Sequence, residues 1–263
     1  MSSEELRHTR STVAAATWGA PDTGVVLARL EVDATQLQVW STQVERATGV
    51  LVQPEHVVTI AVGRALVAAP GLNRVVRLGR AVPRNGVAVT LLRHGRHRRV
   101  DDADAIEPTR LVALTDGEGE TAAWAQTGRT LGRVPASFLR GILRLVAWMG
   151  RIGAAVPGVG IEPGAVGAAV VQQGAGFDVQ FNPPVPHAGT VLHAVVGNVD
   201  DRVVARAGQP VVRPVLPVDL AIDARLCAND ELEVLVDVLR GTLEDPWELG
   251  GVERPPAADL PRR

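Results

Sequence analysis

The chain has 263 residues and a formal net charge of −2, so it is long enough for one large domain or two small ones, and no positive excess favours nucleic acid or an anionic membrane. Its 27 lysine-plus-arginine residues are all arginine, which excludes Schiff-base chemistry, a P-loop lysine and a lipoyl-lysine on this chain. A single cysteine, Cys227, excludes an internal disulfide and a paired-cysteine metal site.

The first elements follow clear periodicities. Val25–Asp33 alternates apolar and polar side chains, which predicts a half-buried strand. Helical spacing of apolar residues then predicts a helix up to Gly49 and a second helix opened by Pro54. We expect His56, in the first turn of that second helix, to be exposed.

The middle of the chain is less regular. Val75–Leu92 indicates two strands around a turn, and Arg93–Arg99 indicates a basic turn, either solvated or suited to a phosphate. Arg110–Thr115 is predicted as a strand, followed by helices over Thr121–Leu131 and from Pro135 onward.

The last third is rich in β-branched residues and glycine. It ends with a helix from about Asn229, which has acidic residues in its first turn, and a Pro-rich tail. Four strands are predicted: Ala165–Val171, Thr190–Val199, Val203–Ala207 and Val211–Ile222.

Several segments, taken together and in this order, resemble one family. The segments are RALVAAPGLN, FNPP, VVGNVDDRVV, VVRPVLPVDLAID and LEDP. They resemble the catalytic core of the dihydrolipoamide acyltransferases, the acyl-transfer subunits of 2-oxo acid dehydrogenase complexes. The resemblance implies an α/β two-layer sandwich of the chloramphenicol acetyltransferase type, a mixed sheet packed by helices, in a core domain over residues 23–250. Residues 1–22 would be an N-terminal arm and residues 251–263 a Pro-rich tail.

The resemblance also implies how the chain assembles. Members of the family form trimers with active sites in channels between subunits, so we expect a homotrimer or a multiple of trimers. We expect a small-molecule substrate, and neither a nucleic acid nor a membrane as partner. The polar start of the chain and the lack of a long uncharged apolar run predict a soluble cytoplasmic protein.

The family's catalytic motif departs from its usual sequence here. The motif is DHRVxDG, in which the histidine is the general base, and the matching segment of this chain reads DARLCAN. Asp223 and Arg225 match, whereas Ala224 replaces the histidine and Ala228 replaces the aspartate. Alanine has no lone pair that accepts a proton, so the base role is lost at this position.

Other residues are candidates for the missing chemistry. The family's oxyanion-stabilising hydroxyl aligns with Gln172, whose amide can donate a hydrogen bond. His187 and His193 are candidates for a relocated base, although His193 also fits a core position on a strand. Cys227 is either a replacement nucleophile or a small buried apolar residue.

Three functions remain open on this basis. The first is an enzyme of a bacterial biosynthetic pathway that performs a cyclisation, elimination or rearrangement in the channel between subunits. The second is a CoA-dependent acyltransferase with a relocated base, for which a CoA thioester is the implied cofactor. The third is a catalytically silent binding or assembly protein.

Overall fold

The computed structural model describes residues 24–77, 80–94, 96–117, 166–174 and 189–256. The chain divides into two compact units, one of residues 1–22, 76–82 and 118–165, the other of residues 23–75, 83–117 and 166–263. Almost all described residues belong to the second unit, and apart from the short strands between residues 74 and 83 the architecture below is that of this unit. The domain boundaries expected from the sequence stay a prediction.

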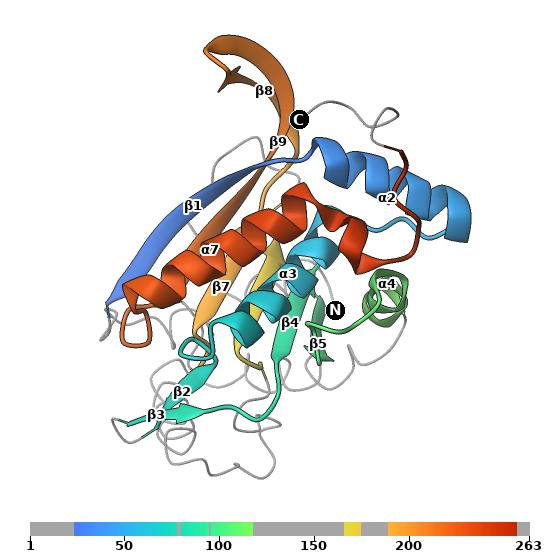
Figure 1. Cartoon of the computed structure of the whole chain (residues 1–263). Coiled ribbons are helices and arrows are strands. Elements are labelled where there is room, and N and C mark those ends of the chain that lie inside the picture. Colours follow the sequence, from blue (N-terminus) through green and yellow to red (C-terminus); the bar gives the residue numbers. More distant parts are fainter. Residues whose placement is uncertain (1–23, 78–79, 95, 118–165, 175–188, 257–263) are drawn as a thin grey trace, which may run out of the picture. The chain divides into compact units, whose positions relative to one another are not determined.

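The main sheet of this unit is mixed. Its strands lie in the order β1-β9-β7-β6-β4-β5, and β8 pairs with the first half of β9 (Figure 1). Strands β4, β6 and β7 run parallel, and the other pairs are antiparallel. The strands are β1 (Val25–Asp33), β4 (Ala88–Arg93), β5 (Arg96–Asp101), β6 (Ala169–Gln173), β7 (Leu192–Val196), β8 (Asp200–Arg206) and β9 (Gln209–Asp223).

Helices cover one face of this sheet. Helix α3 contacts β4, β6 and β7, and α7 contacts β1 and packs along α3 (Figure 1). We call this the α3 face of the sheet and the opposite one the far face. The described helices are α2 (Thr35–Thr48), α3 (Pro54–Ala68), α4 (Pro108–Asp116) and α7 (Asn229–Glu244), followed by the 3-10 helix η1 (Pro246–Leu249).

The core lies between the sheet and these helices. Alternate strand residues point to one face, so each strand contributes every second side chain to this layer. Burying one large aliphatic side chain, such as leucine, isoleucine or valine, contributes roughly 1.5–3 kcal/mol to folding. The buried residues of this layer include Leu30, Val32, Val89, Leu91, Val171, Leu192, Ala194, Leu220 and Ile222.

Most of the predicted elements are confirmed. The mixed α/β fold class, the first strand, the first two helices, the strands of the last third and the final helix all occur, with ends shifted by a few residues. The helices predicted over Thr121–Leu131 and from Pro135, and the segment FNPP, lie outside the described residues.

Three predictions for the middle of the chain are wrong. The strand expected at Arg110–Thr115 is helix α4: Pro108 occupies its first turn, and the buried residues recur at helical spacing. The region expected to hold two strands contains three, because β2 (Arg74–Arg77) and β3 (Arg80–Pro83) form a separate two-stranded sheet before β4. Most of the expected basic turn is strand β5.

Candidate functional site

One ion pair fixes which side chains occupy each face of the sheet. Arg93 on β4 reaches Glu55 on helix α3, with 2.8 Å between Nε and Oε1, so Arg93 points to the α3 face. Its alternating neighbour Leu92 therefore points to the far face, as does Thr90. Register carries this assignment across the sheet, because residues directly opposite each other share a face.

The far face carries a histidine beside a glutamine. Thr90 pairs with Val170 on β6, and Val170 pairs with His193 on β7. His193 and Gln172 consequently project from the same face, and His193 Nε2 lies 3.2 Å from Gln172 Oε1. Because an amide oxygen only accepts, the imidazole donates from Nε2, and Nδ1 is the basic nitrogen of the neutral ring. The His193 residue is only 1% exposed.

A carboxylate lies one strand further along the same face. His193 pairs with Ala221 on β9, and Asp219 is two residues away on that strand. Arg29 on β1 is directly opposite Asp219 and forms two parallel hydrogen bonds to it, Nε to Oδ1 at 2.6 Å and Nη2 to Oδ2 at 2.7 Å. This bidentate contact raises the pKa of the Arg29 guanidinium above its ordinary value.

The degenerate motif begins at the end of β9. Asp223 is buried, and its carboxylate accepts hydrogen bonds from the Arg225 backbone N–H at 3.0 Å, from Nε at 2.9 Å and from Nη2 at 2.5 Å. The side-chain hydrogen bonds to Asp223 raise the pKa of Arg225. Between them, Ala224 is exposed and donates its backbone N–H to Gly24 O at 3.1 Å. Asp223 and Arg225 thus form an ion pair around a position that carries only a methyl group.

The remaining residues of the motif offer weaker chemistry. Burial, and secondarily the negative charge of Asp223, raise the pKa of the Cys227 thiol. A raised pKa leaves less thiolate at neutral pH, so the environment does not activate Cys227 as a nucleophile. Ala228 is the N-cap of helix α7 and makes no side-chain cap hydrogen bond. His187 lies outside the described residues.

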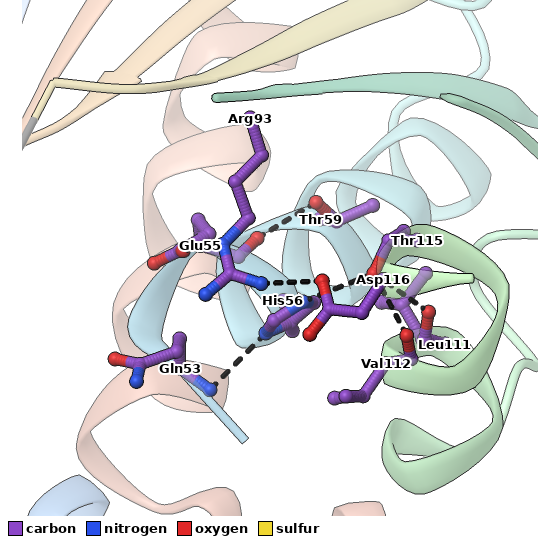
Figure 2. A network of polar contacts seen from close by, with 9 residues as sticks. All are labelled: Gln53, Glu55, His56, Thr59, Arg93, Leu111, Val112, Thr115 and Asp116. Carbon is purple, nitrogen blue, oxygen red and sulfur yellow. Dashed lines mark hydrogen bonds and ion pairs between the residues drawn. The ribbon is translucent and has the colours of Figure 1, made fainter. Parts of the chain in front are cut away.

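A second polar network lies on the α3 face and connects three elements (Figure 2). Arg93 bridges two carboxylates, the 4%-exposed side chain of Glu55 on α3 and the half-exposed side chain of Asp116 on α4. His56 accepts a hydrogen bond from the Gln53 backbone N–H at Nδ1, at 3.1 Å, and donates from Nε2 to Thr115 Oγ1 at 3.2 Å.

This network corrects the prediction that His56 is exposed, because His56 is fully buried. Burial, with the nearby charge of Arg93, lowers the pKa of His56 to about 4, so the ring is neutral at physiological pH. Burial also raises the pKa of Glu55. The network uses its donors and acceptors to join α3, α4 and β4, as expected of a structural cluster.

Two other kinds of site find no support in the described part of the chain. No group of three or more histidine, cysteine or carboxylate residues there could hold a metal ion. None of the described helices is both long enough and apolar enough to cross a membrane.

Arg29 and Asp219 were not predicted as site residues from the sequence. The signal was present: Asp219 is a carboxylate inside the apolar run that becomes β9, and Arg29 is a charged residue in the alternating strand β1. A buried charge in a central strand requires a partner, but the sequence alone did not give the register that pairs these two residues.

Comparisons with known proteins address the fold. No family model matches the sequence, and no curated protein matches it. Solved structures match along nearly the whole chain, including the following three. A probable dihydrolipoamide acetyltransferase from Listeria monocytogenes 4b F2365 matches with a TM-score of 0.59 at 16% identity, covering 93% of this chain and 92% of that chain.

Two further matches are of the same kind. The cubic core of a pyruvate dehydrogenase multienzyme complex matches with a TM-score of 0.63 at 13% identity, covering 94% of this chain and 90% of that chain. The dihydrolipoamide acetyltransferase of Azotobacter vinelandii, in which a serine, a histidine and an asparagine have been investigated for catalytic roles, matches with a TM-score of 0.62 at 14% identity and the same coverage.

These similarities establish the class of fold. The chain has the acyltransferase fold of dihydrolipoamide acetyltransferase catalytic cores, as the motifs in its sequence predicted.

Proposed function

We propose that this chain is an enzyme of acyltransferase fold that acts on a small molecule at the far face of its sheet, with His193 as the proton-transferring group. The observation that supports this is the pair of His193 and Gln172. A hydrogen bond to the amide oxygen fixes the tautomer of the imidazole, and an oriented histidine is the commonest general acid or base in enzymes.

The place of this pair supports a relocated base. Ala221, opposite His193, is two residues before Asp223, the first residue of the degenerate motif, and the side chains of Ala221 and Asp223 share the far face. Ala224 supplies no base. His193 lies on β7, the strand between β6, which carries Gln172, and β9, which ends at the motif.

The reaction that fits best is a cyclisation, elimination or rearrangement within a small molecule, in a bacterial biosynthetic pathway. Such steps depend on positioning and on one proton transfer in a water-poor site, and the near-complete burial of His193 provides such surroundings. Acyl transfer from a CoA thioester is the second candidate, and the presence of a histidine beside Gln172 favours it. Gln172 would then donate to the oxyanion.

The assembly belongs to the same proposal. The cubic core among the similar structures supports a homotrimer or a multiple of trimers, with the site in a channel between subunits. We place the protein in the cytoplasm. His187 remains a second candidate for the base, and native mass spectrometry of the purified chain tests the trimer.

The test of catalysis compares His193→Gln with His97→Gln. Strand β5 pairs with β4 so that His97 is opposite Leu92, which puts His97 on the same face but exposed at the edge of the sheet. Each protein is incubated with a filtered small-molecule extract of the source cells, and products are compared by mass spectrometry. We expect His193→Gln to lower turnover by roughly 10²–10⁴-fold and His97→Gln to leave it unchanged.

The two reaction classes separate in a second assay. Acetyl-CoA and propionyl-CoA are offered with simple thiol, alcohol and amine acceptors, and the release of CoA thiol is followed. Release that depends on His193 assigns acyl transfer, and release only in the double variant Ala224→His/Ala228→Asp excludes acyl transfer by the native chain. Equal product profiles for the wild type and His193→Gln would refute the proposed role of His193.

A further inference from the structure

Two carboxylates flank His193 on the far face. His193 is directly opposite Ala221, and Asp219 and Asp223 lie two residues to either side of Ala221 on β9. Diagonal neighbours on one face of an antiparallel pair are about 7–8 Å apart, within reach of long side chains. The imidazole therefore lies between two acidic positions of the neighbouring strand.

Each of these carboxylates is neutralised by its own arginine. Arg29 holds both oxygens of Asp219, and Arg225 holds both oxygens of Asp223. The two guanidinium groups come from outside the β7–β9 pair, one from β1 and one from the segment after β9. At the neighbouring register positions on this face, Val170, Val195, Ala221 and Gln172 are uncharged.

The ion pair of Arg29 and Asp219 is largely withdrawn from solvent. Asp219 lies in the interior of the long strand β9 with its side chain only 12% exposed, whereas the side chain of Arg29 is 29% exposed. A buried ion pair seldom stabilises a fold more than apolar residues of the same size would. Strands β1 and β9 are already joined by their backbone ladder, so the pair is not needed to hold them together.

We propose that Arg29 and Asp219 are specificity-determining residues, which cancel each other's charge so that the site beside His193 accepts an uncharged apolar group of the substrate. This inference rests on the proposed function, since it concerns the molecule on which His193 acts. Loss of either partner leaves one unpaired charge at or next to the position diagonal to His193 on this face. That charge selects for a ligand of opposite sign.

The experiment uses three probes with the same alkyl chain: hexanamide, hexanoate and hexylammonium. Binding to the full chain is measured at low salt by NMR, following the imidazole signals of His193, which are identified by their loss in His193→Gln. The variants are Arg29→Gln, Asp219→Asn and the double variant. Arg202→Gln is the matched control, because Arg202 forms a 2.7 Å ion pair with Glu31, also on β1.

We expect the wild type and the double variant to bind hexanamide in preference to either ion. Arg29→Gln should shift the preference toward hexylammonium, and Asp219→Asn toward hexanoate, each by about tenfold. Arg202→Gln should behave as the wild type. Should Arg29→Gln fail to fold, Asp219→Asn, which keeps the shape of the side chain, and the double variant carry the test.

Three results would overturn the inference: a wild type that prefers one of the ions, single variants with wild-type selectivity, or no probe that shifts the His193 signals. Failure of the proposed function is a different result. If His193→Gln retained full turnover while the probe preferences switched as expected, the charge-balanced site would stand and the catalytic role of His193 would fall.

Discussion

The two faces of the sheet carry polar clusters made of similar residues, arranged in different ways. On the α3 face, Arg93 and His56 connect a strand to two helices, α3 and α4 (Figure 2). On the far face, the contacts of His193 and Arg29 join strands that share one sheet. Polar contacts between separate elements add to the apolar packing that holds those elements together. The strands of a sheet are already joined by backbone hydrogen bonds, so side-chain contacts between them can have another role, such as binding a ligand.

The largest expected effect on stability belongs to the α3 face. Replacing Arg93 with Met leaves the carboxylate of Glu55 buried without its cation, and such a loss costs about 3–5 kcal/mol of unfolding free energy. The double variant Arg93→Met/Glu55→Gln removes both charges and should recover most of that loss. Urea unfolding followed by circular dichroism measures both. If Arg93→Met were as stable as the wild type, the network would not have the structural role assigned to it.

His56 should make this face sensitive to acid. Its pKa is lowered from 6.5 to about 4 in the folded chain, so the folded state binds its proton less readily than the unfolded state. The stability that His56 contributes is complete above about pH 6.5 and is lost as pH falls toward 4, by about 3 kcal/mol. Protonation also gives Nδ1 a hydrogen where it now accepts from the Gln53 N–H.

The difference between wild type and His56→Gln isolates this contribution. The raised pKa of Glu55 acts in the opposite sense, since a carboxyl that holds its proton more tightly when folded gains stability as pH falls. Because both proteins retain Glu55, subtracting their unfolding free energies at each pH leaves the share of His56. Parallel curves between pH 6.5 and 4 would contradict the assignment.

The sequence predicted the layers of the fold better than its polar partners. Strand β1 and helix α7 were found because each buries one stripe with a clear period. Helix α4 was missed because six residues of mixed polarity fit either period, and Pro108 was not used as its start. His56 was wrongly predicted to be exposed. Its position in the helix shows on which side of α3 it lies, but not that α4 packs against that side.

The candidate site shows the same limit. The loss of the base at Ala224 could be predicted from the motif alone. The pair of His193 and Gln172 could be predicted only as two separate candidates, since the contact depends on the parallel register of β6 and β7. Asp219 needed the register with β1 as well. Pairings between residues far apart in sequence are set by the assembled sheet and are not coded locally.

The smallest expected effect separates the two arginines of the far face. Asp219 depends on the guanidinium of Arg29 for both oxygens, so Arg29→Gln should cost about 1–3 kcal/mol. Asp223 also accepts the backbone N–H of residue 225, which survives in Arg225→Gln, and the Arg225 side chain is 47% exposed. We therefore expect Arg225→Gln to cost less than about 1 kcal/mol in urea unfolding. Equal losses of unfolding free energy in the two variants would contradict this prediction. They would mean that the burial of each carboxylate determines the loss, and not the number of hydrogen-bond donors that remain to it.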